Sequence, residues 1–317
     1  MTGLPEYDFR SPMEMRSYLL AGLLLLLPRA GEPDSLREEP SRPKGGHNDS
    51  VHRYFPDLDS RLNAVRYGRW RALEIAWTLG INRELDRTFS SYLLALLADP
   101  PRYAPEADRV APRFLREARP VFLALRWGQT LEAQLSDALA SPDASAARTE
   151  ARLQKALNAY RREAYALAEP AGLAGGRWPP SEAAARAPVS ARILLSGTAL
   201  FVQTAQDLAE ANFGEQRWRV METIEEFDLG FAGGFVAEDP ATPGALSPRA
   251  YQSEAPAVAE AYSDVADRLD RLARFRLEVF EALVPGGQTP SARRERDERL
   301  RTVARRYGLP AEGIGGR

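Results

Sequence analysis

Apolar residues recur three and four positions apart from about Asp57 to the C-terminus, and no segment alternates apolar and polar residues convincingly. Three- and four-residue spacing is typical of amphipathic helices, whereas alternation is typical of strands. The pattern therefore predicts an all-α fold, a multi-helix bundle of about eight to nine helices.

Proline, glycine and capping residues set the expected helix boundaries. The predicted helices span Asp59 to Leu79, Ile81 to Leu97, Glu106 to Ala118, Val121 to Leu139, Ser141 to about Ala168, Val189 to Ala211, Gln216 to Asp228, Glu254 to Leu283, and Thr289 to Tyr307.

Two of these helices carry patterns that bear on function. The helix at residues 216–228 has Trp218, Met221, Ile224 and Phe227 at amphipathic spacing, and Gly230 is expected to begin a loop. The helix at residues 254–283 has a heptad seam interrupted by Arg276. That seam suits packing within the bundle or a dimer contact.

The segment before the helical body has two parts. Residues 17–27 form an uncharged leucine-rich run, too short to cross a membrane but typical of the apolar region of a signal peptide. The next residues are rich in proline, glycine and charge, which predicts a disordered linker. The expected organisation is a signal-like segment at 1–30, the linker at 31–56 and a helical domain at 57–317. A Gly/Pro-rich loop within this domain allows two subdomains, 57–170 and 181–317.

Composition narrows the classes of partner. Forty-two basic residues nearly balance forty-four acidic ones, so the chain lacks the strong positive field of a general nucleic-acid binder, and we expect no nucleic-acid partner. The absence of cysteine excludes disulfides, thiolate catalysis and thiolate metal sites. Membrane contact is expected only through the N-terminal segment, if that segment stays uncleaved.

Residues for the common catalytic sites are scarce. The only histidines, His47 and His52, both precede the helical body, and no helix carries a Glu-x-x-His pair. The nucleophile motif Gly-x-Ser-x-Gly is also missing. The sequence therefore predicts no metal and no cofactor, and it favours a non-catalytic protein over an enzyme.

A cluster of acidic residues is the first candidate site. Glu222, Glu225, Glu226 and Asp228 lie three and four residues apart, so several share one face of a helix. Partly buried, such carboxylates can bind a cation or work as an acid and a base. A solvated acidic face is the alternative interpretation.

The second candidate is an anion-binding site on the first helix. Arg66 and Arg69 alternate there with Tyr67 and Trp70, and guanidinium groups beside aromatic rings can hold an anion. The helical positions of these residues are spread around the axis. The alternative is therefore that the arginines are solvated or paired within the chain.

Together these patterns predict an exported, periplasmic or extracellular, non-catalytic helical module for binding or assembly. Its expected partner is another protein or a second copy of the chain. One alternative is an enzyme or small-molecule binder with an interhelical pocket lined by carboxylates and arginines. Another is a cytoplasmic protein whose leucine-rich segment is a helix of the core.

Overall fold

Two layers of helices make up the body of the protein in the computed structural model. The structure describes residues 49–80, 83–142, 145–168, 188–210, 213–236, 256–283 and 289–315. These residues form twelve helices, eight of them with seven or more residues, and no strand, which confirms the predicted all-α bundle. No helix in these ranges is both long and apolar enough to span a membrane.

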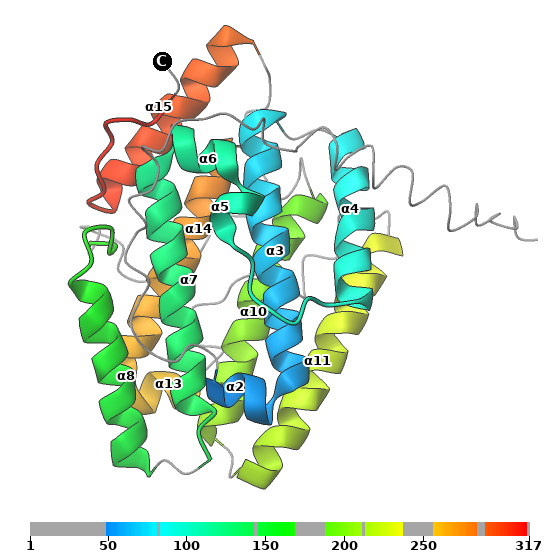
Figure 1. Cartoon of the computed structure of the whole chain (residues 1–317), viewed down its shortest axis with the longest axis vertical. Helices are drawn as coiled ribbons and strands as arrows, with labels where there is room; N and C mark the ends of the chain where they lie inside the picture. Colours follow the sequence, from blue (N-terminus) through cyan, green and yellow to red (C-terminus); the bar gives the residue numbers. More distant parts are fainter. Residues whose placement is uncertain are drawn as a thin grey trace, which may run out of the picture. The chain divides into compact units, whose positions relative to one another are not determined.

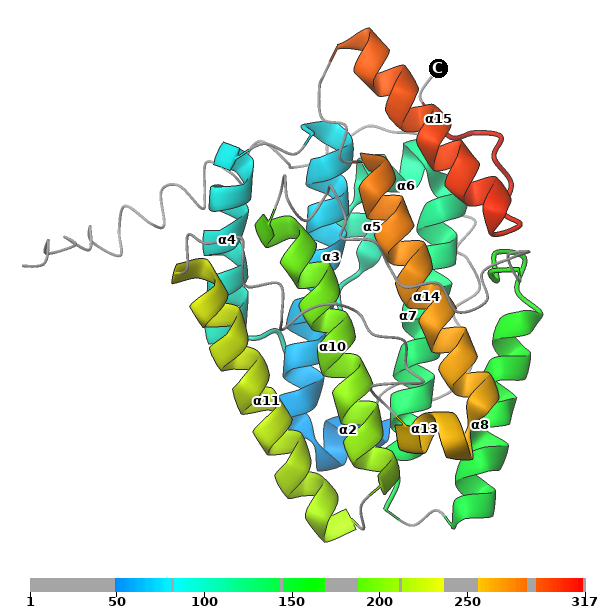
Figure 2. The ribbon, with the colours of Figure 1, turned by 180° about the vertical axis from the view of Figure 1, so that it is seen from behind.

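One layer contains α4, α3 and α7, and the other contains α11, α10 and α14 (Figures 1 and 2). The bounds of these six helices are α3 (Pro56–Thr78), α4 (Arg83–Ala98), α7 (Arg119–Leu139), α10 (Pro188–Glu210), α11 (Phe213–Val236) and α14 (Ser263–Leu283). The others are α2 (Asp49–Tyr54), α5 (Ala107–Val110), α6 (Pro112–Glu117), α8 (Ala146–Arg161), α13 (Pro256–Ala261) and α15 (Pro290–Arg306).

Helix α3 lies at the centre of the bundle and packs against α10, α4, α6 and α11. Its buried aromatic side chains contact α6 and α7: the ring of Trp70 lies 4.6 Å from that of Phe122, and the ring of Trp77 lies 5.7 Å from that of Phe114. Because α3 is packed on several sides, four of its charged residues are buried along with its apolar ones: Asp59, Arg66, Arg69 and Glu74. The polar groups of α3 must therefore find partners inside the protein.

Side chains of the long helices cap the N-termini of three short helices. The carboxylate of Asp137 on α7 accepts hydrogen bonds from the backbone N–H groups of Ser50 (2.5 Å) and Val51 (3.3 Å) in α2. Glu74 on α3 accepts from two N–H groups at the start of α6, and Gln206 on α10 accepts from one in α13. These caps satisfy backbone donors that a helix cannot satisfy itself.

Two predicted boundaries near the middle of the chain are wrong. The predicted helix over 106–118 is divided into α5 and α6, because Pro112 starts a new helix after Ala111. Helix α8 begins after Ser145, whose hydroxyl accepts from the N–H of Arg148, and not at Ser141. Both prolines and serines can start helices, and the sequence offers several of each here.

Three further boundaries also differ from the prediction. Helix α11 continues through Gly230 to Val236, where a loop was expected. The long C-terminal helix is broken at Tyr262 into α13 and α14. The end of the expected linker is folded: residues Asp49–Tyr54 form α2, and the side chain of Val51 in this helix is completely buried. The leucine-rich run at 17–27 lies outside the described residues.

Candidate functional site

The predicted acidic cluster lies on α11, at the edge of the layer formed by α11, α10 and α14 (Figure 2). The side chains of Glu222, Glu225 and Glu226 are exposed. Asp228 instead turns toward α3, where both of its carboxylate oxygens accept from Arg61, at 3.0 Å from Nε and 2.8 Å from Nη2. The cluster is therefore divided into three solvated carboxylates and one that fastens α11 to α3.

Large apolar side chains share this outer side of α11. Trp218 is 68% exposed, Leu229 is 74% exposed and Met221 is 39% exposed. Of the four apolar residues noted at amphipathic spacing, Ile224 is buried at 4% exposure, whereas Trp218 and Met221 face outward. We call the exposed set the α11 face; its members are Trp218, Met221, Glu222, Glu225, Glu226 and Leu229.

The predicted anion-binding residues on α3 point mostly into the protein. Arg66, Arg69 and Trp70 are buried, and Tyr67 is partly exposed. The Nη1 of Arg66 donates to Asn63 Oδ1 at 2.9 Å. Burial lowers the pKa of Arg66, and the carboxylates of Asp59 and Glu132 oppose that shift. The arginines are thus paired within the chain and do not form an open anion site.

Two residues outside the predicted sites, Glu132 and Arg276, complete this buried cluster. Glu132 of α7 forms ion pairs with Arg276 of α14 and, at 3.8 Å between Oε2 and Nη1, with Arg69 of α3. Burial alone would raise the pKa of Glu132, but the charges of Arg276 and Arg69 outweigh it and hold that pKa below its usual range. In the sequence, the only indication of this cluster was Arg276, which interrupts the apolar heptad seam.

A small cavity adjoins the buried cluster. Its volume is about 20 Å³ and its lining residues are Arg69, Trp70, Leu73, Leu125, Gln129 and Arg276. The indole N–H of Trp70 donates to Gln129 Oε1 at 2.8 Å on one side of it. A space of this size holds about one water molecule. It cannot accommodate an organic substrate, so the cluster is a polar element of the core.

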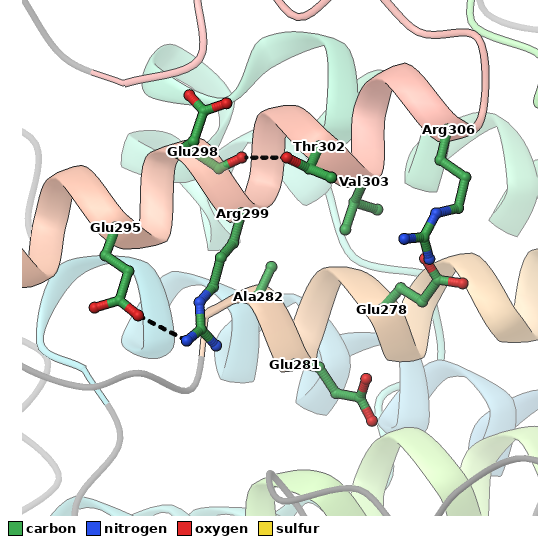
Figure 3. Close-up of a pocket in the computed structure, with 9 residues that line it drawn as sticks. All are labelled: Glu278, Glu281, Ala282, Glu295, Glu298, Arg299, Thr302, Val303 and Arg306. Atoms are coloured by element: carbon green, nitrogen blue, oxygen red, sulfur yellow. Dashed lines mark hydrogen bonds and ion pairs between the residues drawn. The ribbon is translucent and has the colours of Figure 1, made fainter.

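A larger groove of about 550 Å³ runs between α14 and α15 (Figure 3). Its walls carry four glutamates and two arginines, with Ala282 and Val303 between them. Figure 3 shows Arg306 directed at Glu278 and Arg299 directed at Glu295, and each pair is separated by 2.7 Å. Glu278 also accepts from the hydroxyl of the buried Tyr307. Glu278 therefore helps to hold α15 on α14, whereas the pair of Glu295 and Arg299 lies within α15.

Neither a metal site nor a similar protein gives further evidence on the α11 face, the buried cluster or the groove. Among the residues that the structure describes, no three acidic or histidine side chains gather closely enough to hold a metal ion. His52 contacts the carboxylate of Asp59 at 2.9 Å, and His47 lies outside the described ranges. Comparison of the chain with protein-family models, curated proteins and solved structures finds no match.

Proposed function

We propose that the protein is a non-catalytic helical module for binding or assembly, and that it receives its partner on the α11 face. The observation that carries this proposal is the exposure of Trp218 and Leu229, each about two-thirds or more accessible, on one side of one helix. Exposed apolar residues scattered singly need no explanation, but a group on one helix face is typical of an interaction surface.

The energetics of the α11 face support a docking role. Covering a large apolar side chain contributes roughly 1.5–3 kcal/mol, and tryptophan is among the residues that most often dominate an interface. The inner side of α11 is already packed, with Val220 and Ile224 buried. The outer apolar residues are therefore not needed to hold α11 in the bundle.

The alternative function is a small-molecule binder or enzyme that uses the groove between α14 and α15. The groove volume falls within the roughly 300–1,000 Å³ typical of ligand pockets. Two of its carboxylates, however, already pair with arginines that line the groove: Glu278 with Arg306 of the other helix, and Glu295 with Arg299 of the same helix. If the groove serves a ligand, Glu278→Gln should change binding of small cations in calorimetric titrations while the α11 face is intact.

Photo-cross-linking in cells tests the proposed surface. A photoreactive amino acid at position 222 on α11 is compared with one at position 150 on α8, where Glu150 is also exposed. We expect a discrete cross-linked product from position 222 that disappears when Leu229→Ser is added, and none from position 150. Equal labelling from both positions, or none from position 222, would contradict docking on α11.

We also propose that the protein is exported. The support is the leucine-rich run at 17–27, which has the length of a signal-peptide core. Cell fractionation with intact-mass analysis of the N-terminus tests this proposal. Recovery outside the cytoplasm without the first 30 or so residues is expected, and a full-length cytoplasmic product would contradict export.

A further inference from the structure

The charge of the α11 face indicates what kind of partner it takes. Glu222, Glu225 and Glu226 are exposed, and within the described part of the chain none of them forms an ion pair. Arg219 precedes these glutamates on the same helix, but its guanidinium pairs with Glu210 and Glu215 instead. The α11 face therefore offers three carboxylates to whatever covers it.

The apolar residues of the α11 face define a line along the helix. Trp218 and Leu229 are eleven residues apart, which is about three turns, or roughly 16 Å, with a rotation of only about 20° between them. Glu222 and Glu225 fall between them on the same side. A partner must therefore bring apolar groups along this line and positive charge close beside it.

We infer that the partner segment is a basic amphipathic helix lying along α11. A helix of about three turns matches the length of the line, and side chains at its i, i+3 and i+7 positions can pack on Trp218 and Leu229. Lysine or arginine on its flanks pairs with Glu222, Glu225 and Glu226, and an arginine can also stack on the indole of Trp218. An anionic membrane surface is disfavoured, because the same carboxylates repel it.

This inference rests on the proposed function and adds the chemistry of the partner. It is tested with the purified full chain and two synthetic, fluorescently labelled amphipathic helices. Both peptides carry the same leucine pattern, and their polar faces consist of lysine and arginine in one and glutamate in the other. Fluorescence anisotropy gives the affinity of each peptide, and vesicles of anionic lipid serve as a third probe.

Two double variants isolate the contribution of charge on α11. Glu222→Arg/Glu225→Arg reverses charge on the α11 face, and the matched control Glu150→Arg/Glu260→Arg makes the same change at exposed positions on α8 and α13. We expect the basic peptide to bind, and its affinity to fall about tenfold or more in the α11 variant but not in the control. Trp218→Ala should weaken binding without any change of charge.

Several results would overturn the inference. Equal weakening by both double variants would show that only overall charge attracts the peptide. Equal binding of the acidic peptide, or binding of vesicles in place of peptides, would show that the partner chemistry is wrong. If neither peptide binds but position 222 still gives its cross-link, the inference fails and the proposed function stands. If the cross-link is also missing, both fail.

Discussion

Replacing Glu132 with glutamine should destabilise the protein more than any substitution on its surface. Glu132 is 3% exposed and lies between Arg276 and Arg69, which are each 7% exposed. At 3.8 Å, one such attraction amounts to about 4 kcal/mol with an effective dielectric constant near 20, before desolvation is subtracted. Removing one partner of a buried ion pair typically costs about 3–5 kcal/mol, because the remaining charge is left uncompensated.

Urea denaturation at neutral pH measures this effect. We expect Glu132→Gln to lower the free energy of unfolding by about 3 kcal/mol or more, and the control Glu150→Gln on the surface to change it by less than about 0.5 kcal/mol. A triple variant, Glu132→Leu with Arg69→Met and Arg276→Met, should recover much of the loss because no charge stays buried.

The pH dependence gives an independent check on the buried cluster. Because the pKa of Glu132 is lowered in the folded chain, its contribution is present above the ordinary value of 4.5 and is lost as the pH falls through the lowered value. Glu132→Gln should remove that acid-side loss. A decrease of less than about 1 kcal/mol at neutral pH would refute the reasoning, since Glu132 would then not be needed to compensate the arginines.

Three further predictions concern the packing of the helices. Burial raises the pKa of Glu74, so the free energy of unfolding should fall as the pH rises above 4.5 toward the raised value. Glu74→Gln should flatten that fall when urea denaturation is repeated across the pH range. An unchanged dependence of the free energy of unfolding on pH would contradict this prediction. Asp137→Ala should cost about 1–2 kcal/mol and speed hydrogen exchange in α2, and unchanged exchange there would show that the cap is dispensable. A Cβ on Gly197 would overlap Cγ1 of Val65. Gly197→Ala should therefore lower the free energy of unfolding by about 1–3 kcal/mol, despite a helix-propensity gain of about 1 kcal/mol. A raised melting temperature would contradict the close approach of α10 and α3.

The periodicity of apolar residues was sufficient to predict the helices but not every break between them. The cap at Thr289 and the start of α15 at Pro290 were predicted correctly, because both residues are local signals. The break at Tyr262 and the helical run through Gly230 were not, because packing against neighbouring helices decides them and single-residue propensities are weak.

The candidate sites were predictable only in part. The sequence places Glu222, Glu225 and Glu226 on one helix, but it cannot say which side of that helix faces the bundle. Trp218 fits the apolar pattern of a buried stripe, and its exposure results from the way α11 packs on α10 and α3. The pairing of Glu132 with Arg276 joins residues 144 positions apart, which no local pattern indicates.

The central claim is that the apolar residues of the α11 face serve a partner and not the fold. The most direct test is the free energy of unfolding of the Trp218→Ser/Leu229→Ser double variant, measured by urea denaturation. If the α11 face is exposed for docking, the value should stay within about 0.5 kcal/mol of that of the unmodified protein. A loss of about 2 kcal/mol or more would mean that these side chains are buried in the protein's own fold, and would contradict the claim.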